Sequence, residues 1–194
     1  MKSLSLALAL ATFLGTGSGV AAPAQEAQEK PPVYDEKADA RAQLAAALAR
    51  AKADNKRVLV QWGANWCGWC LKLHELCGSD ARIRRKLLYE YEVVRVDVGR
   101  FDRNVELAEE LGADFKGSGV PFLTVLDADG KPLVQQETGA LEVPGEPRHD
   151  PARVLAFLAE HQAPYLDARE LYAAALAEAK ARGKRLFVHI GAPW

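Results

Sequence analysis

The stretch Trp66-Cys67-Gly68-Trp69-Cys70 decides the fold of this chain. It follows a short apolar run, Val58 to Trp62, and opens a segment of helical character, Leu71 to Leu76. Residues three apart on a helix have Cα atoms roughly 5 Å apart, inside the usual disulfide range of about 4.4–6.8 Å. A turn that presents two cysteines between a strand and a helix therefore indicates a dithiol that can close into a disulfide.

The two cysteines are expected to differ in role. Cys67 stands at the start of the helix, where unpaired N–H groups and the positive end of the dipole stabilise a thiolate. Cys70 lies one turn further in and is expected to be more buried. We predict that Cys67 is the exposed nucleophile with a lowered pKa and that Cys70 is the resolving thiol.

On these residues the chain resembles the thioredoxin superfamily. The resemblance implies an α/β fold with a central mixed β-sheet flanked by helices. It also implies a redox-active disulfide, Cys67–Cys70, that exchanges with cysteine-containing protein substrates and a redox partner protein and needs no cofactor. Two departures from the family are visible. Gln61 stands where many thioredoxins carry a buried acid, and Glu75 stands where their helix has a kinking proline.

The resemblance assigns further residues to substrate binding. Pro121 matches the family's cis-proline, which faces the dithiol, and the backbone of Val120 is expected to pair with a bound peptide. An ordinary trans proline at the start of a strand is the alternative. Trp66, Gly68 and Trp69 complete the expected binding surface. Trp62 either flanks the site or packs in the core.

Hydrophobic periodicity and capping residues predict the order of elements around this motif. Helices are expected at 38–54, at 71–76 continuing to 79–89 after a break at Gly78-Ser79, from a cap at Asp102 to Leu111, and from Asp150-Pro151 to His161. Strands are expected at 58–62, 93–98, 119–126 and 132–137. No convincing strand precedes the first helix, where thioredoxin has one, and residues 31–34 are the candidate for a remnant of it.

A third cysteine raises the question of metal binding. Cys67, Cys70, His74 and Cys77 share one helical stripe, but Cys67 and Cys77 are roughly 15 Å apart along a helix, against about 2.3 Å for a Zn–S bond. We therefore predict no metal. Cys77 is expected to be a small buried hydrophobe, with a redox or ligand role as the alternative. His74 is expected to be solvated or packed.

The beginning of the chain has the pattern of a signal peptide, residues 1–24. Lys2 is followed by an apolar run, Leu4 to Leu14, and an A-x-A-like cleavage site at Ala22-Pro23-Ala24. The run is too short for a stable membrane span, although an uncleaved anchor is the alternative. We predict export to the periplasm or the extracellular space, with residues 25–35 as a linker. A net charge of −1 with scattered basic residues argues against nucleic-acid binding.

The end of the chain repeats its beginning. Asp167 to Trp194 matches Asp39 to Trp66 at an offset of 128, with 17 of 28 positions identical. Similar alanine-rich composition is the alternative explanation. We expect residues 36–163 to form a thioredoxin-like domain. Residues 164–194 are expected to be the truncated start of a second one, with a strand at 186–190 and a cysteine directly beyond Trp194.

These observations predict an exported thiol–disulfide oxidoreductase. Reduction is favoured over oxidation, because nothing between the cysteines stabilises the thiolate beyond the helix end. A protein-binding or chaperone-like module without redox turnover is the main alternative, and metal delivery by the dithiol is a third.

Overall fold

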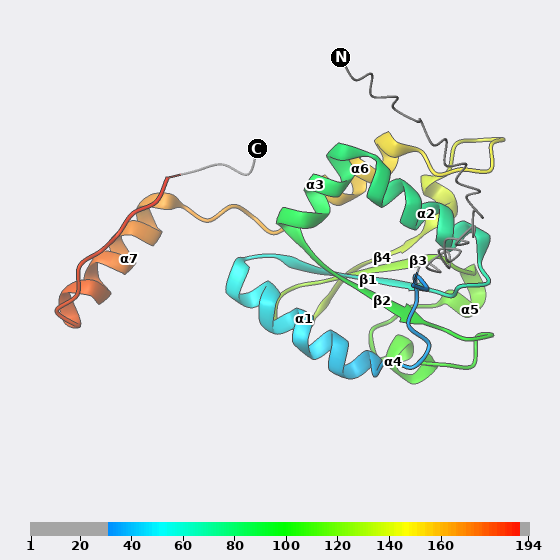
Figure 1. Ribbon diagram of the computed structural model, residues 1–194, viewed down its shortest axis with the longest axis horizontal. Coiled ribbons are helices and arrows are strands. Elements are labelled where there is room, and N and C mark those ends of the chain that lie inside the picture. The colour runs from blue at the N-terminus through cyan, green and yellow to red at the C-terminus, as the bar shows by residue number, and fades with distance from the viewer. Residues whose placement is uncertain (1–30, 191–194) are drawn as a thin grey trace, which may run out of the picture. The chain divides into compact units, whose positions relative to one another are not determined.

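A four-stranded mixed sheet forms the centre of the computed structural model, which describes residues 31–190 (Figure 1). The strand order is β2-β1-β3-β4, with β1 parallel to β2 and the other neighbours antiparallel. Their bounds are β1 Arg57–Gly63, β2 Tyr91–Asp97, β3 Phe122–Leu126 and β4 Pro132–Glu137. The predictions for the signal peptide at 1–24, for most of the linker and for residues 191–194 lie outside the described residues.

Strand β1 is buried on both faces because helices cover both sides of the sheet. Val60 and Trp62 point into a core with α1 (Ala40–Asp54), α4 (Val105–Glu110) and α5 (Phe115–Ser118). Leu59 points into a second core on the opposite face, with α2 (Gly68–Ser79), α3 (Ala81–Glu90) and α6 (Pro151–Glu160). This two-sided layering confirms the predicted α/β class, a thioredoxin-like sheet flanked by helices (Figure 1).

Aspartate caps begin several helices, among them α1, α3 and α6. The carboxylates of Asp39, Asp80 and Asp150 accept backbone N–H groups of the first turns of α1, α3 and α6. Each cap satisfies donors that the helix leaves unpaired. The Asp150-Pro151 start of α6 is as predicted, whereas the break between α2 and α3 falls at Asp80, just after the predicted Gly78-Ser79.

One predicted helix start is wrong, and the remnant strand considered at 31–34 is not formed. Asp102 does not cap a helix, because its carboxylate accepts the backbone N–H of Arg100 within the preceding turn. Helix α4 instead begins at Val105, after Asn104 in the left-handed conformation (φ 54°). Residues 31–34 form no strand, and the chain there runs as irregular backbone. In both places a hydrogen bond between a side chain and the backbone replaces the expected element. Asp102 bonds within its own turn, and Asn65 bonds the backbone of Tyr34.

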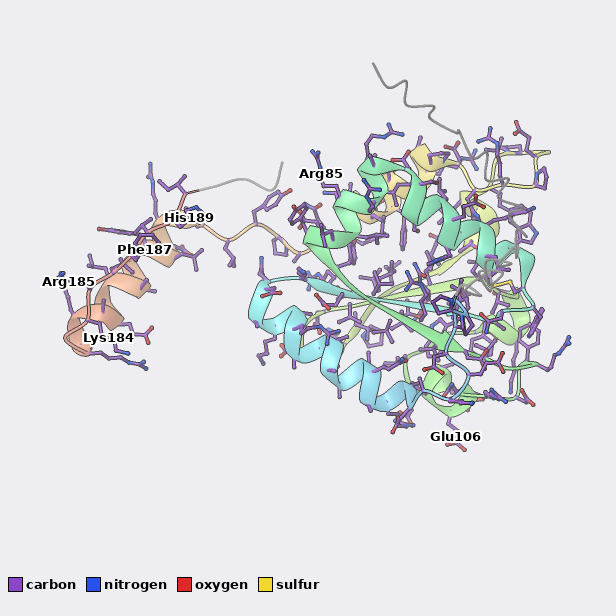
Figure 2. The ribbon with its side chains drawn as sticks, in the orientation of Figure 1. Arg85, Glu106, Lys184, Arg185, Phe187 and His189 are labelled. Atoms are coloured by element: carbon purple, nitrogen blue, oxygen red, sulfur yellow. A yellow bond between two sulfur atoms is a disulfide. The ribbon has the colours of Figure 1, made fainter. Side chains whose placement is uncertain are left out.

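The predicted strand at 186–190 is also absent. Helix α7 (Ala168–Ala181) has no buried residue, and residues 184–190 have no regular structure. A strand needs a hydrogen-bonded neighbour, and no described strand pairs with this segment. Phe187 is consequently 88% exposed (Figure 2). Within residues 31–190, no helix has both the length and the apolar character needed to cross a membrane.

Candidate active site

Cys67 and Cys70 are joined in a disulfide at the N-terminus of α2, with their Cα atoms 5.3 Å apart. Cys67 is the N-cap residue, and its Sγ accepts the backbone N–H of Cys70 at 3.1 Å. After reduction, the same N–H and the positive helix end would stabilise a thiolate on Cys67. The predicted pairing and the position of the pair at a helix start are both confirmed.

The predicted exposure of Cys67 is wrong for this disulfide form. Cys67 is 5% exposed and Cys70 1%, so both sulfurs are buried, although in the expected order. They pack in one small apolar cluster with Tyr34, and Val120 and Trp69 lie against it. These neighbours come from distant parts of the sequence, which is why helix position alone overestimated the exposure.

The Val120-Pro121 peptide bond is cis, as predicted. The carbonyl oxygen of Val120 lies 3.4 Å from Cys67 Sγ, so this turn borders the disulfide. The next carbonyl, that of Pro121, accepts a hydrogen bond from the buried hydroxyl of Thr138 at 2.7 Å. The hydrogen bond from Thr138 thus fixes the turn at 120–121, and the carbonyl of Val120 faces the cysteine pair.

Trp66 is 45% exposed beside the disulfide. Its indole N–H donates to the carbonyl of Gly99 at 2.6 Å, and its ring lies edge-on to Phe101, with 5.7 Å between ring centroids. The guanidinium of Arg100 lies over the same ring, 5.3 Å from its centroid. The loop that follows β2 thus fixes the aromatic side chain that precedes the first cysteine.

Trp69 is held between two side chains on the other flank. The ammonium of Lys72 lies 4.8 Å from its ring centroid, and the ring of His149 meets it edge-on at 5.3 Å. Neither ring nitrogen of the buried His149 has a hydrogen-bond partner among residues 31–190. Burial lowers the pKa of this histidine, and the charge of Lys72 adds to the effect. Gly68 begins α2 with open space on its side-chain side.

Trp62 belongs to the core and not to the rim of the site. It is fully buried, its indole N–H donates to Thr124 Oγ1 at 3.0 Å, and its ring packs on Phe115. Because side chains alternate along a strand, Trp62 points to the α1 face, whereas the cysteines start a helix on the other face. The interpretation of Trp62 as core packing is the correct one.

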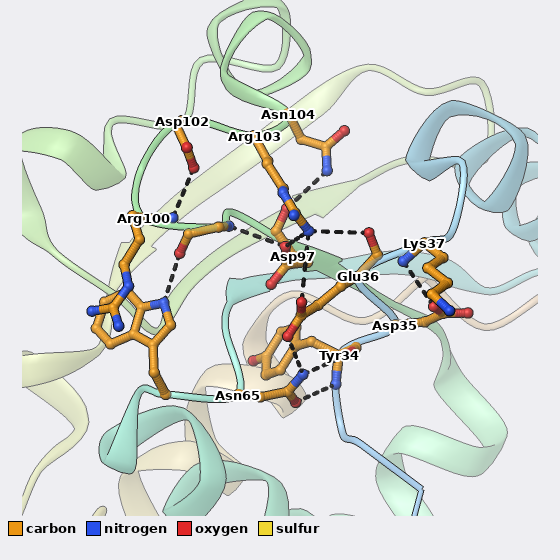
Figure 3. A network of polar contacts seen from close by, with 12 residues as sticks. Tyr34, Asp35, Glu36, Lys37, Asn65, Asp97, Arg100, Asp102, Arg103 and Asn104 are labelled. Atoms are coloured by element: carbon orange, nitrogen blue, oxygen red, sulfur yellow. Dashed lines mark hydrogen bonds and ion pairs between the residues drawn. The ribbon is translucent and has the colours of Figure 1, made fainter.

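Sequence reasoning missed Tyr34 and Asn65. Asn65 Oδ1 accepts the backbone N–H of Tyr34 at 3.0 Å, and Asn65 Nδ2 donates to the Tyr34 carbonyl at 2.8 Å (Figure 3). This pair of bonds ties the segment before α1 to the turn that carries the cysteines. The Tyr34 ring then packs on the disulfide from behind. No local pattern joins residues 31 positions apart, so the sequence contains no signal for this contact.

Gly63, the last residue of β1, leaves the space that Tyr34 and Cys70 occupy. A Cβ at this position would meet the Tyr34 hydroxyl and ring, and would lie 2.9 Å from Cys70 Sγ. We expect Gly63→Ala to lower the free energy of unfolding by about 1–3 kcal/mol, as overpacking of a core does. Chemical denaturation measures the change.

Gly78→Ala is the matched control for that prediction. Gly78 lies in α2 with nothing within 4 Å of an added Cβ, so alanine should stabilise the helix by about 1 kcal/mol. Equal effects of the two substitutions would show that Gly63 does not make room for the tyrosine and the disulfide.

Cys77 is a free, buried thiol on the inner face of α2. Burial raises its pKa to about 11, opposed in part by the charge of Arg95 and by a hydrogen bond with Gln61. The thiol is therefore protonated at neutral pH and is a poor nucleophile. His74 is partly buried, and burial lowers its pKa. Residues 31–190 contain no group of three or more His, Cys, Asp or Glu that could hold a metal ion.

Comparison with known proteins shows which class of protein shares this fold and this cysteine pair. A family described as thioredoxin-like matches residues 39–128. The solved structure of a disulphide isomerase from Xylella fastidiosa Temecula1 is 34% identical over 66% of this chain and 95% of that one, with a TM-score of 0.58. The fold and the cysteine pair define a thiol–disulfide oxidoreductase-like protein. The chain belongs to the thioredoxin-like family.

One curated relative is the disulfide bond reductase DsbH of Chlamydia pneumoniae. It is 29% identical to this chain over 96 residues, which make up 47% of this chain and 58% of the relative. The match thus spans little more than half the length of that protein.

Proposed function

We propose that this protein is an exported thiol–disulfide oxidoreductase that exchanges disulfides with protein substrates through Cys67 and Cys70. The observation that carries the proposal is the disulfide between these residues at the N-terminus of α2, beside the carbonyl of Val120. Both relatives are named for disulfide chemistry, one as a reductase and the other as an isomerase.

In the proposed reaction, the Cys67 thiolate attacks one sulfur of a substrate disulfide. A mixed disulfide forms, and the substrate's other sulfur leaves as a thiolate that takes a proton from water. Cys70 then loses its proton and attacks Cys67 Sγ, which closes the Cys67–Cys70 disulfide and releases the second substrate thiolate. The enzyme's dithiol is oxidised and the substrate is reduced. The reverse sequence oxidises a substrate dithiol.

We propose reduction as the physiological direction. The stabilisation of a Cys67 thiolate comes from the helix end and the Cys70 N–H, and the residues between the cysteines, Gly68 and Trp69, add no charge. A cysteine pair is strongly oxidising when its reduced form is strongly stabilised. Without such stabilisation of the thiolate, the reduced pair gives up its electrons more readily and acts as a reductant.

The substrate-binding surface proposed for this reaction is formed by Trp66, Gly68, Trp69, Val120 and Pro121. The exposed edge of Trp66 and the open space at Gly68 leave room for a peptide next to the disulfide. The half-buried backbone at Val120 adjoins Cys67 Sγ, so a peptide paired there would bring its sulfur to the attacking atom. A redox partner protein would use the same surface.

Reduction of insulin with a dithiol donor tests the function. We expect the wild-type protein to accelerate insulin precipitation well above the donor alone. Cys77→Ser should act like the wild type, because the Cys77 thiol is protonated and buried. If the wild-type protein binds reduced or unfolded chains but leaves the rate at that of the donor, the protein is a binding module without redox turnover.

We further propose that residues 36–163 form the catalytic domain and that residues 164–194 begin a second thioredoxin-like repeat. Ala163 is the last buried residue of the described chain. The N-terminal caps of α1 and α7 also lie at equivalent positions of the repeat. Asp39 and Asp167 cap α1 and α7, at an offset of 128 residues.

The C-terminal ends of the two helices agree as well. Asn55 and Gly183 both take the left-handed conformation, with φ of 52° and 60°. The N–H of Lys56 donates to Ala51 at 2.9 Å, and that of Lys184 donates to Ala179 at 2.8 Å. Shared composition alone does not place caps and turns in the same register, which supports common descent of the two segments.

A further inference from the structure

In the resolving step of this reaction, Cys70 becomes negatively charged inside a buried apolar cluster. Cys70 is 1% exposed and lies in the cluster with Tyr34 and Cys67. Burial disfavours the thiolate that Cys70 must form before it can attack Cys67. Gln61 of β1 is buried, and its amide cannot take up or release a proton. A polar group that favours the charged form of Cys70 is therefore needed from another element.

Tyr34 brings such a group to the back of the disulfide. Its side chain is 1% exposed, and its hydroxyl oxygen and Cys70 Sγ border the same small volume beside the Cα of Gly63. The phenol is therefore next to the sulfur that must ionise. A phenolic O–H can donate to a thiolate, and hydrogen bonds to ionised acceptors are stronger than neutral ones.

A network of hydrogen bonds around residues 34–36 fixes the position of Tyr34. Besides the two bonds between Tyr34 and Asn65, Asn65 Nδ2 reaches Glu36 Oε1 at 3.2 Å, and the guanidinium of Arg103 donates to the Glu36 carbonyl at 3.1 Å (Figure 3). Arg103 is itself held by the buried carboxylate of Asp97 at 3.3 Å. These hydrogen bonds fix the segment that carries Tyr34 and join it to the turn that carries the cysteines.

We propose that the Tyr34 hydroxyl is the hydrogen-bond donor that stabilises the Cys70 thiolate during the resolving step. This inference rests on the proposed function and names a further residue of the same site. In the step, the Cys70 proton passes to water and the Tyr34 O–H turns towards the sulfur. The Cys70 sulfur then forms the bond to Cys67 Sγ. The bond between Cys67 and the substrate breaks, and its electron pair leaves with the substrate thiolate.

Tyr34 keeps its proton throughout and does not act as a base. Burial raises the pKa of its phenol far above neutrality, against a smaller opposing effect of Arg95. The charged or titratable groups whose charges act on Tyr34 are Arg95 and Asp97 of β2 and Cys77 of α2. On β1, Gly63 lies beside the Tyr34 ring, and glycine does not titrate. A phenol in this setting can donate a hydrogen bond but cannot accept the Cys70 proton.

The test separates the two thiol steps with an aromatic disulfide, dithiobis(nitrobenzoate). Reduced enzyme releases one coloured thiolate when Cys67 attacks and a second when Cys70 resolves the mixed disulfide. For Tyr34→Phe we expect an unchanged first phase and a second phase about tenfold slower at neutral pH, the effect of raising the Cys70 pKa by about one unit. At alkaline pH the second phase should recover the wild-type rate.

Tyr91→Phe is the matched control. Tyr91 is also a buried tyrosine, and its hydroxyl donates to the carbonyl of Leu158 at 2.7 Å, outside the cysteine cluster. This variant should lose stability and keep both phases at every pH. A second measurement titrates the Cys70 thiolate by its ultraviolet absorbance in a Cys67→Ser/Cys77→Ser background. Tyr34→Phe should raise the midpoint of that titration.

The outcomes are distinct. A Tyr34→Phe second phase that is unchanged, or that is slowed equally at all pH values, overturns the role of the hydroxyl while the proposed function stands. An unshifted Cys70 titration overturns it as well. A wild-type protein that shows no first phase overturns the proposed function, and the inference with it.

Discussion

Replacing Cys70 by serine is expected to trap mixed disulfides between Cys67 and client proteins. Cys67 keeps its place as N-cap of α2, so its attack on a substrate disulfide remains, but the resolving thiol is missing. Affinity purification followed by non-reducing electrophoresis should show adducts that collapse on addition of a reducing agent. Insulin reduction by this variant should fall to the rate of the dithiol donor.

Cys67→Ser is the companion variant and should trap no adducts. Cys70 lies behind Cys67 in the cluster with Tyr34, where a client disulfide cannot reach it. Insulin reduction should again fall to the donor rate, because the attacking sulfur is gone. Cys77→Ser should behave like the wild type in both assays. Equal trapping by the Cys67 and Cys70 variants would contradict the assigned roles.

Removing the chain from Pro164 onward is expected to leave the first domain folded and active. No described residue after Ala163 is buried. One exposed hydrogen bond, from Asn55 Nδ2 to the Pro164 carbonyl at 3.0 Å, joins this segment to α1, and such a bond contributes about 1 kcal/mol or less. An isolated helix of the length of α7 is marginal in water, so its basic residues should be open to trypsin.

Limited proteolysis and thermal unfolding check that prediction. Trypsin should cut first in the segment that holds Arg169 and Lys184, while a fragment ending near Ala163 persists and reduces insulin. The midpoint of thermal unfolding of the shortened protein should match that of the full chain. A segment that resists trypsin, and whose removal lowers the midpoint by several degrees, would belong to the first domain.

Much of the fold could be predicted from local pattern because local physics specifies it. The apolar run at 58–62 reads as a strand buried on both faces, and β1 occupies Arg57–Gly63. Asp150 followed by Pro151 is a helix start by capping and by the fixed φ of proline, and α6 begins there. The prediction at Asp102 was wrong, because a carboxylate that can cap a helix can equally close a turn, and that of Asp102 accepts the backbone N–H of Arg100.

The end of the chain shows where local pattern is insufficient. Residues 186–190 have the apolar character of a strand but form none in the described structure. The same pattern in β1 succeeds because β2 and β3 pair with it on both sides. Strand formation is a property of the partners as much as of the segment.

The sequence by itself determined the cysteine pair and its place at a helix start, because a three-residue spacing after an apolar run expresses both. The cis bond before Pro121 was expected from the resemblance to the thioredoxin superfamily. Only the tertiary structure decided what surrounds the pair. The depth of Cys67, the core position of Trp62 and the contact of Tyr34 with the disulfide depend on segments that lie far apart in the chain. Such contacts arise from packing between elements, and no periodicity within one element encodes them.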